Sequence, residues 1–220
     1  VGGLLKEVPA RPQPRRSLPI KQGKPHVLLL AAGKSSRMRG QNKLLRQIDG
    51  TPLVVRTAKR LAQSNAGGMT IVINPETVGL AVAVQGQGDQ IIQAKDANSG
   101  LAVSLRAGIN ALPKTATAVI IALADMPDVT AQDIDALIAA FDPANGALIV
   151  APTAPNGKRG NPVLFDRRYF EPLASLTGDT GAKALIEAEI SNLCLVPRGA
   201  GVLVDLDTPE AWDVWEQSNT

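Results

Sequence analysis

The sequence is poor in aromatic residues, cysteine and histidine. Only 3% of its 220 residues are Phe, Trp or Tyr, although 45% are hydrophobic, so Val, Leu, Ile and Ala must fill the core. That composition suits a parallel sheet covered by helices. The single cysteine, Cys194, excludes an intrachain disulfide and a cysteine-rich metal site. The single histidine, His26, stands at the start of an apolar run, so we interpret it as structural and expect chemistry without an imidazole base.

Long apolar runs are also missing. The longest, residues 118–124, is far shorter than the ~20 residues that a membrane helix needs. Residues 1–24 lack the apolar segment of a signal peptide. The sequence therefore predicts a cytoplasmic protein with no membrane partner.

Basic charge is concentrated at the N-terminus. Residues 1–24 carry six basic side chains and one acidic side chain, whereas residues 25–220 carry 17 basic and 19 acidic ones. The sequence pI of 9.2 thus reflects the first segment, and we expect no nucleic-acid partner. Because that segment is rich in Pro and Arg and has little to bury, we predict a disordered basic tail over 1–24 and a single domain over 25–220.

Short apolar runs alternate with helical patterns from Pro25 onward. Predicted strands cover residues 26–31, 69–73, 90–93, 118–124, 147–151, 162–165, 193–196 and 202–206. Two predicted helices cover residues 101–112 and 180–190. Three more begin at the N-caps Thr51, Thr130 and Thr208, and the helix at Thr130 starts with a capping box and runs to Phe141. This alternation predicts a doubly wound, mostly parallel α/β sheet with helices on both faces.

Residues 30–45, LAAGKSSRMRGQNKLL, follow the first predicted strand directly. They leave the sheet at the carboxyl edge of the strands, where open α/β sheets bind ligands. Leu30 and the small residues Ala31, Ala32 and Gly33 would let a base and ribose lie close to the backbone. The spacing is neither that of a Walker loop nor that of a dinucleotide-binding glycine fingerprint.

Phosphate-binding groups follow in the same segment. Loop amides from Gly33 through Ser35 to Ser36 can form a nest for phosphate oxygens. Arg37 and Lys43 would neutralise a triphosphate, the first by bidentate contact and the second as a compact charge. An ordinary exposed basic loop between a strand and a helix is the alternative.

Three acidic residues are candidates for metal chemistry. Asp125 stands at the end of the central predicted strand, where its carboxylate can reach a ligand-bound metal, although an Asp before Met-Pro could also cap a turn. Asp205 and Asp207 are two residues apart and would point the same way in an extended segment. Asp207 also precedes Thr208, where it could instead stabilise a helix dipole.

Residues 30–45 resemble the signature of the MobA- and MocA-like nucleotidyltransferase family, which activates the molybdenum cofactor, and of its sugar-nucleotide relatives. Five further segments occur in the order expected for that family: 98–108, 125–127, 160–162, 178–183 and 205–210. The resemblance spans about residues 25–215 and implies a nucleotide-diphospho-sugar transferase-like, Rossmann-type fold. Each motif is weak alone, but the ordered set is specific.

The resemblance also implies roles for individual residues. Asp125 and an acid of the C-terminal pair, Asp207 in preference to Asp205, would bind the metal, and an oxygen-only ligand set favours Mg²⁺, with Mn²⁺ as an alternative. The remaining implied residues are Asn98, Gly100 and Ser104 for the nucleotide and Gly160, Asn161, Pro162 and Asp179 for the acceptor. The alternative for most of them is ordinary turn chemistry.

The first motif points to one branch of the family. Leu-Ala-Ala-Gly, as in residues 30–33, is typical of the members that use CTP, whereas those that use GTP have glycine at the third position. The resemblance therefore implies a molybdenum cofactor cytidylyltransferase acting on CTP and Mo-molybdopterin, with a molybdenum hydroxylase as possible recipient. Arg39 is a departure, because it lengthens the loop between Arg37 and Lys43.

Two alternatives remain open from the sequence. The nearest is a related enzyme with another acceptor, such as a phospholactate guanylyltransferase or a sugar-phosphate nucleotidyltransferase. The other is a non-catalytic factor that carries molybdopterin to a hydroxylase. Retention of Lys43, Asp125 and Asp207 argues against a carrier, which has no use for a metal-triphosphate site.

Overall fold

The computed structural model describes residues 23–33, 35, 37–38, 42–178 and 181–218. Most of the predicted tail therefore lies outside the described residues, as do Ser36 and Asp179 among the predicted site residues. Gly23 is already packed, because its carbonyl accepts a hydrogen bond from the Thr117 hydroxyl at 3.1 Å. In the described part of the chain, no helix has both the length and the apolarity to cross a membrane.

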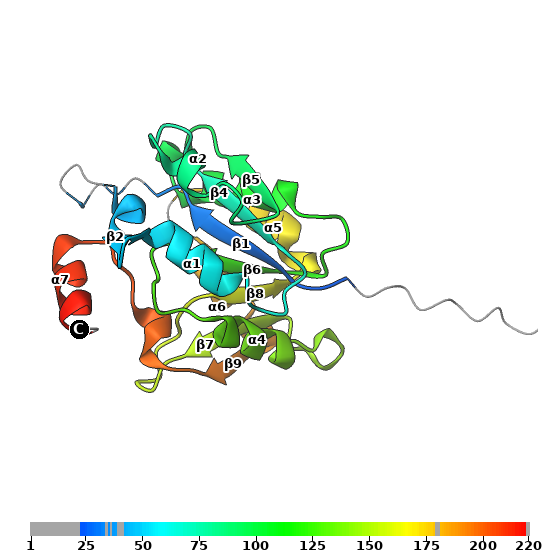
Figure 1. Cartoon of the computed structure of the whole chain (residues 1–220). Coiled ribbons are helices and arrows are strands. Elements are labelled where there is room, and N and C mark those ends of the chain that lie inside the picture. The colour runs from blue at the N-terminus through cyan, green and yellow to red at the C-terminus, as the bar shows by residue number, and fades with distance from the viewer. Residues whose placement is uncertain (1–22, 34, 36, 39–41, 179–180, 219–220) are drawn as a thin grey trace, which may run out of the picture.

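A seven-stranded sheet runs through the centre of the molecule in the order β5-β4-β1-β6-β8-β7-β9 (Figure 1). The first four strands in this order are mutually parallel, β8 is antiparallel to both of its neighbours, and β9 is parallel to β7. The strands are β1 (His26–Ala31), β4 (Met69–Ile73), β5 (Gln90–Gln93), β6 (Ala118–Leu123), β7 (Ile149–Thr153), β8 (Val163–Asp166) and β9 (Leu193–Pro197).

Helices cover both faces of this sheet. They are α1 (Leu53–Leu61), α2 (Leu80–Ala83), α3 (Leu101–Ala111), α4 (Ala131–Ala140), α5 (Phe170–Ala174), α6 (Lys183–Ala188) and α7 (Pro209–Ser218). Side chains of α1, α4 and α7 join one core cluster, and side chains of α3, α5 and α6 join the other. The predicted α/β architecture is confirmed.

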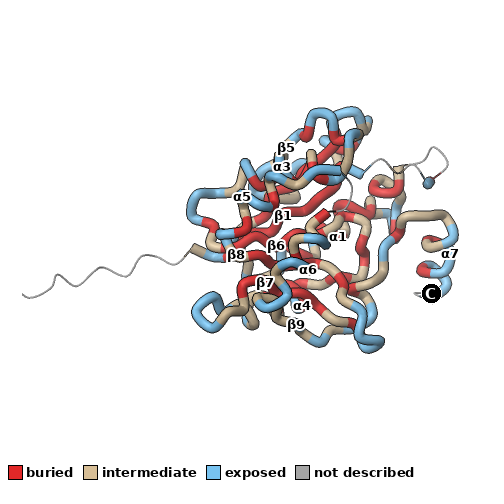
Figure 2. The backbone as a smooth tube through the Cα atoms, turned by 180° about the vertical axis from the view of Figure 1, so that it is seen from behind, coloured by how far each residue is buried: buried red, intermediate tan, exposed pale blue. Residues whose placement is uncertain are grey.

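The central strand shows why both faces must be covered. Along β1, Val27, Leu29 and Ala31 point into one cluster, whereas Leu28 and Leu30 point into the other. Every residue of β1 is buried, and the tube of β1 is correspondingly red in Figure 2. A strand that is apolar on both faces forms a buried parallel sheet, as the sequence indicates.

The start of α1 differs from the prediction. Thr51–Pro52 form a short strand, β3, that pairs with β2 (Gln47–Ile48) through a turn at Asp49 and Gly50, both of which have positive φ. An Asp-Gly loop of this kind favours a tight hairpin. Pro52, not Thr51, therefore takes the N-cap position of α1. The capping box at Thr130 is confirmed, with the Asp133 side chain accepting from the Thr130 backbone amide.

The predicted strand over residues 202–206 is wrong. Residues Ala200–Leu203 form a 3-10 helix, and the Val202 carbonyl accepts a hydrogen bond from the Asn161 amide at 3.0 Å. Val202 therefore packs against the loop that follows β7, whereas Leu206 bonds to Asp125 and joins the core cluster with α1. The chain then continues through Asp207 to α7.

Candidate active site

The loop after β1 forms the floor and one wall of the candidate site. Ala32 is buried, whereas a Cβ placed on Gly33 would meet no described residue within 4 Å, so among these residues the backbone is open to a ligand there. Ser35 has a positive φ of 49°, and its carbonyl accepts from the Met38 amide at 2.9 Å. The Ser35 hydroxyl in turn accepts from the Lys43 amide at 3.3 Å, which joins the two ends of the loop.

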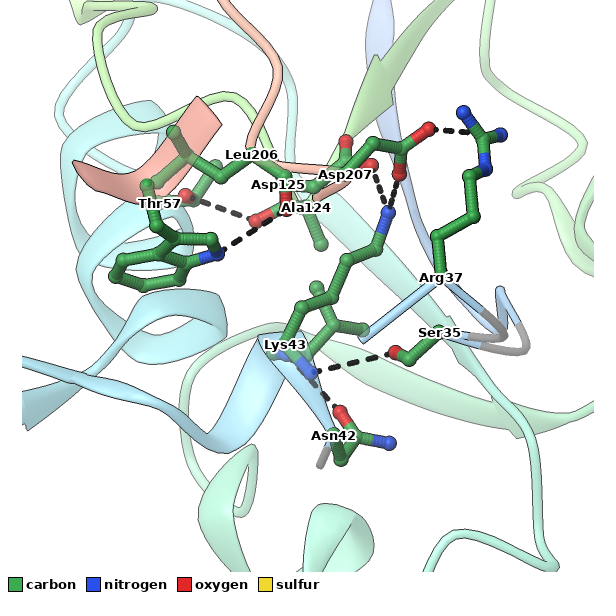
Figure 3. Close-up of polar contacts among 11 residues, drawn as sticks. Ser35, Arg37, Asn42, Lys43, Thr57, Ala124, Asp125, Leu206 and Asp207 are labelled. Carbon is green, nitrogen blue, oxygen red and sulfur yellow. Dashed lines mark hydrogen bonds and ion pairs between the residues drawn. The ribbon is translucent and has the colours of Figure 1, made fainter. Parts of the chain in front are cut away.

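Lys43 begins a short 3-10 helix, Lys43–Leu45, that aims its side chain into the fold. The Asn42 side chain caps this helix by accepting from the Leu44 amide at 3.0 Å. The Lys43 ammonium lies between two carboxylates, 2.5 Å from Asp125 Oδ2 and in contact with Asp207 Oδ1 (Figure 3). Only 8% of the Lys43 side chain is exposed, so the contact is shielded from water.

The two carboxylates come from distant parts of the sequence. Asp125 follows β6, and Asp207 lies in the segment that enters α7. The Leu206 amide donates to the Asp125 carbonyl at 3.0 Å and so fixes one backbone against the other. On the solvent side, the Arg37 guanidinium pairs with Asp207 Oδ2 at 3.1 Å (Figure 3).

This arrangement perturbs the ionisable groups. Burial works against the charge of the Lys43 ammonium, but Asp125 and Asp207 outweigh it and raise the pKa of Lys43. Burial likewise works against the Asp207 carboxylate, but Lys43 and then Arg37 outweigh it and lower the pKa of Asp207. Burial, followed by repulsion from Asp207 and Asp125, raises the pKa of Asp205. Lys43 and Asp207 therefore both stay charged at neutral pH.

One oxygen of the Asp125 carboxylate has no hydrogen-bond partner among the described residues. Oδ1 of Asp125 is buried and receives no hydrogen bond from any residue that the structure describes. A buried, unpartnered carboxylate oxygen is costly unless a cation or donor reaches it. Together with Asp207, it supplies the oxygen ligands that a hard divalent cation prefers.

Asp205 stands apart from this pair. It is exposed and does not line the cavity beside Lys43. Within the described ranges, no three His, Cys, Asp or Glu side chains converge on one point, so the protein offers two carboxylates there rather than three. Further ligands for an ion would have to come from phosphate oxygens or water.

A cavity of about 450 Å³ opens over this cluster; we call it the loop cavity. Ten of the predicted nucleotide-binding residues line it, and so does Asp207. Ala31 instead points into the core on the other face of β1. The lining consists of Leu30, Ala32, Gly33, Ser35, Arg37, Lys43, Leu44, Ala97, Asn98, Gly100, Leu101, Ser104, Leu123, Asp125 and Asp207.

Asn98 is held firmly at the rim of the loop cavity. Its side-chain carbonyl accepts from the Asn74 amide group at 3.3 Å, and its own amide group donates to Glu76. The Glu76 backbone amide donates to Asn74 Oδ1 at 2.9 Å, which closes the network. The orientation of the Asn98 amide is thereby fixed, which a group that recognises a base edge requires.

A second cavity, the apolar pocket, adjoins the first. It measures about 290 Å³ and shares Leu30, Leu101 and Leu123 with the loop cavity. Gly160 and Asn161 line it, whereas Pro162 follows them through a cis peptide bond and is not part of the lining. The remaining lining residues are Leu105, Ile121, Arg159, Val163, Phe165, Gly181, Ala182, Lys183 and Ile186.

Sequence comparison agrees with this geometry. The family model described as "MobA-like NTP transferase domain" matches residues 27–193, which is most of the chain and includes the β1 loop, Asp125 and the apolar pocket. The chain belongs to this family. It is therefore a nucleotidyltransferase by family. No curated protein gives a match to the sequence.

Several solved structures share the fold of this family member. The Rv0371c homolog from Mycobacterium sp. strain JC1 is 26% identical over 88% of this chain and 95% of its own, with a TM-score of 0.73. Rv0371c of Mycobacterium tuberculosis H37Rv, solved in complex with manganese, is 23% identical over 89% and 99%, with a TM-score of 0.72. A CMP:2-keto-3-deoxy-manno-octonic acid synthetase complexed with CTP is 15% identical over 89% and 98%, with a TM-score of 0.70.

Sequence reasoning missed several residues of the site. Leu44, Ala97, Leu101 and Leu123 line the loop cavity, and their apolar character gave no functional signal. Arg159 lines the apolar pocket one residue before the Gly-Asn-Pro motif, where a basic residue beside a turn could have been noticed. Gly108, the last residue of the 98–108 segment, packs against Leu28 in the core.

Proposed function

We propose that this chain transfers CMP from CTP to the molybdenum cofactor, Mo-molybdopterin, giving molybdopterin cytosine dinucleotide and pyrophosphate. The observation that carries the proposal is the cluster of Lys43, Asp125, Asp207 and Arg37 within the loop cavity. A cavity floored by open backbone and bounded by alternating charges of both signs suits a metal-bound triphosphate better than it suits an uncharged ligand.

In the proposed reaction, an oxygen of the acceptor phosphate forms a bond to the α-phosphorus of CTP, and the bond to pyrophosphate breaks. The acceptor phosphate is already an anion at neutral pH, so no general base is required. Catalysis then consists of positioning and charge stabilisation. Lys43 and Arg37 are the cations that would stabilise the charge developing on pyrophosphate.

Asp125 and Asp207 would hold the divalent cation, which we propose to be Mg²⁺. The unpartnered Oδ1 of Asp125 and the all-oxygen donor set support this assignment. The manganese complex of Rv0371c supports divalent metal use on this fold. When bound, the ion supplies positive charge to the triphosphate oxygens.

The choice of CTP rests on two features of the cavity. The Ala32 methyl is buried in the wall of the loop cavity and reduces the space available for a purine. Asn98 presents a fixed amide at the rim. The CTP complex of the octonic acid synthetase supports the view that this fold accommodates CTP.

The apolar pocket is the proposed acceptor site. Its apolar wall, with Asn161, Arg159 and Lys183 at polar positions, suits an acceptor that carries a ring system and a phosphate. Its continuity with the loop cavity would bring the acceptor phosphate toward the α-phosphate of CTP. A molybdenum hydroxylase is the proposed recipient of the product.

The test is pyrophosphate release from CTP and from GTP, each with and without purified molybdenum cofactor, combined with mass spectrometry of the product. We expect release with CTP only when the cofactor is present, and none in EDTA. Preference for GTP would overturn the cytidylyl assignment. Cofactor binding without any nucleotide turnover would instead identify a carrier.

A further inference from the structure

Helix α7 contacts the site segments through its two tryptophans. Trp212 and Trp215 are three residues apart on one face of α7, with ring centroids 6.5 Å apart in an edge-to-face arrangement. Trp212 is fully buried and Trp215 is 6% exposed, and both belong to the core cluster beneath α1. Apolar packing accounts for the burial of the two rings. It does not account for the hydrogen bonds of their indole N–H groups.

Each indole N–H donates to a segment that carries a site carboxylate. Trp212 Nε1 donates to the Leu206 carbonyl at 3.2 Å, immediately before Asp207. Trp215 Nε1 lies 3.0 Å from both carboxylate oxygens of Asp128, three residues after Asp125. The indole groups thus fix both carboxylate-bearing segments to one helix.

The segment that bears Lys43 is tied to the same helix. Arg46 follows the Lys43 helix directly, and its guanidinium lies 4.3 Å from the Trp212 ring centroid. The same guanidinium pairs with Glu216 of α7 at 2.8 Å. Lys43, Asp125 and Asp207, which are far apart in sequence, therefore all lie within three residues of a direct contact to α7.

We infer that Trp212 and Trp215 are positioning residues, which set the separation of the Asp125 and Asp207 carboxylates for a divalent cation. A cation gains affinity when its ligands are held at the required spacing before it arrives, because ordering them at binding costs free energy. The inference rests on the proposed two-carboxylate cation site and is independent of the nucleotide and the acceptor.

The test measures Mn²⁺ binding to the full chain by monitoring the electron paramagnetic resonance signal of the free ion. Trp212→Phe and Trp215→Phe keep an aromatic ring and remove one N–H donor each. We expect each to weaken Mn²⁺ binding roughly three- to tenfold, somewhat less than the 10–100-fold typical of groups bonded directly to metal ligands. Tyr169→Phe is the matched control, because it also removes one polar bond of a buried aromatic, to Glu189 at 3.0 Å, on the other face of the sheet.

A double-mutant cycle separates positioning from general loss of stability. Asp128→Ala removes the acceptor of Trp215, so adding Trp215→Phe to it should cost little further Mn²⁺ affinity. Tyr169→Phe should lower the melting temperature without changing Mn²⁺ affinity. If the wild type binds Mn²⁺ and both tryptophan variants bind it with unchanged affinity, the inference is overturned but the proposed cation site is not. Failure of the wild type to bind Mn²⁺ would overturn the proposed cation site as well.

Discussion

Lys43 is the residue on which the site's electrostatics depend. Its compact ammonium contacts two carboxylates at once, which the wider guanidinium of Arg could not do in the same space. Without Lys43, the two acids would face one another across a buried gap, and like charges at close range disfavour ionisation. The formal charges of the cluster therefore sum to zero only when Lys43, Arg37 and both carboxylates are present.

Removing either carboxylate charge should abolish most turnover. We expect Asp125→Asn and Asp207→Asn each to lower kcat by a factor of about 10²–10³, which is typical for losing one group that stabilises transition-state charge. Asp213→Asn, on the exposed side of α7, serves as the control and should change kcat by less than about twofold. The measurement is steady-state pyrophosphate release together with circular dichroism. Near wild-type turnover in both site variants would contradict the proposed role of the pair.

The base preference should depend partly on one methyl group. Ala32→Gly enlarges the wall of the loop cavity, and a single methyl is worth about 1–3 kcal/mol, or roughly 10–200-fold in discrimination. We therefore expect the ratio of kcat/KM for CTP over GTP to fall without complete inversion, with Asn98 supplying the remainder. The measurement is kcat/KM for both nucleotides with the same acceptor. An unchanged ratio would show that Ala32 does not contribute to base choice.

His26 should make stability depend on pH near neutrality. It is buried, and its Nε2 lies 3.0 Å from the Thr70 hydroxyl. Burial lowers the pKa of His26 below its usual 6.5, with Asp89 acting in the opposite direction. The unfolded chain therefore takes up a proton first as the pH falls, so stability declines from pH 6.5 down toward the lower folded pKa. Urea unfolding at pH 7.5 and 5.5 should show this decline, and His26→Gln should reduce it.

At the scale of elements, close packing of α3 on β1 fixes the position of the helix that borders the loop cavity. A Cβ on Gly108 would lie 2.4 Å from Leu28 Cδ1 and 2.9 Å from Val72 Cγ2. The glycine therefore lets the helix approach the sheet, and Ser104 and Gly100, about one and two turns earlier, reach the loop cavity as a result. Gly108 affects the nucleotide site only through this packing.

Gly108→Ala should consequently destabilise the fold. Overpacking of a filled core costs about 1–3 kcal/mol, which exceeds the gain of up to about 1 kcal/mol from replacing glycine in a helix. We expect a lower midpoint of urea unfolding and a raised KM for the nucleotide. Gly33→Ala is the informative comparison for stability, because its Cβ would meet nothing within 4 Å. A Gly108→Ala protein as stable as the wild type would show that α3 can shift without cost.

Most elements could be predicted because their signals are local. The apolar runs of β1, β4 and β6 and the capping box of α4 depend on neighbouring residues, and their type was read correctly. The β2–β3 hairpin was missed because the helix-start pattern of Thr51-Pro52 competes with the Asp49-Gly50 turn. Residues 202–206 were misassigned because the Val202–Asn161 bond is a tertiary contact.

Three residues of the site could be predicted from the sequence, but their arrangement could not. Lys43, Asp125 and Asp207 followed from ordered motifs, although their sequence separations exceed 80 residues. What the sequence could not provide is the arrangement between them: Lys43 bridging the acids, the bare Asp125 Oδ1 and the two indole contacts. These depend on the relative placement of distant loops, which periodicity and spacing do not encode.

At the scale of the whole molecule, the direction of the strands changes at β8. The parallel strands β1 and β6 contribute Leu30 and Leu123 to the loop cavity, whereas antiparallel β8 begins with Val163 at the apolar pocket. The two pockets therefore meet where the sheet changes from parallel to antiparallel. In open α/β sheets, ligands bind at the carboxyl ends of the strands where the strand order reverses, which in this sheet is between β1 and β6.

The N-terminal segment should be dispensable for catalysis. Packing of the described chain starts at Gly23, where a Cβ would collide with the Thr115 carbonyl, so the cut should precede it. Residues 1–22 have few apolar side chains, and we expect their removal to leave the melting temperature and CTP turnover within about 2 °C and twofold of the full chain. A large loss of turnover would show that the segment contributes to the site or to an assembly.

Both tryptophans of the chain lie on α7, and both donate to segments that carry the site carboxylates. Ultraviolet excitation at wavelengths that tryptophan absorbs and tyrosine does not therefore reports on this helix alone. The emission of an indole depends on the polarity and charge around its ring and N–H group. Any rearrangement of the carboxylate loops during a titration should shift that emission, so the protein has a built-in optical reporter of its own site.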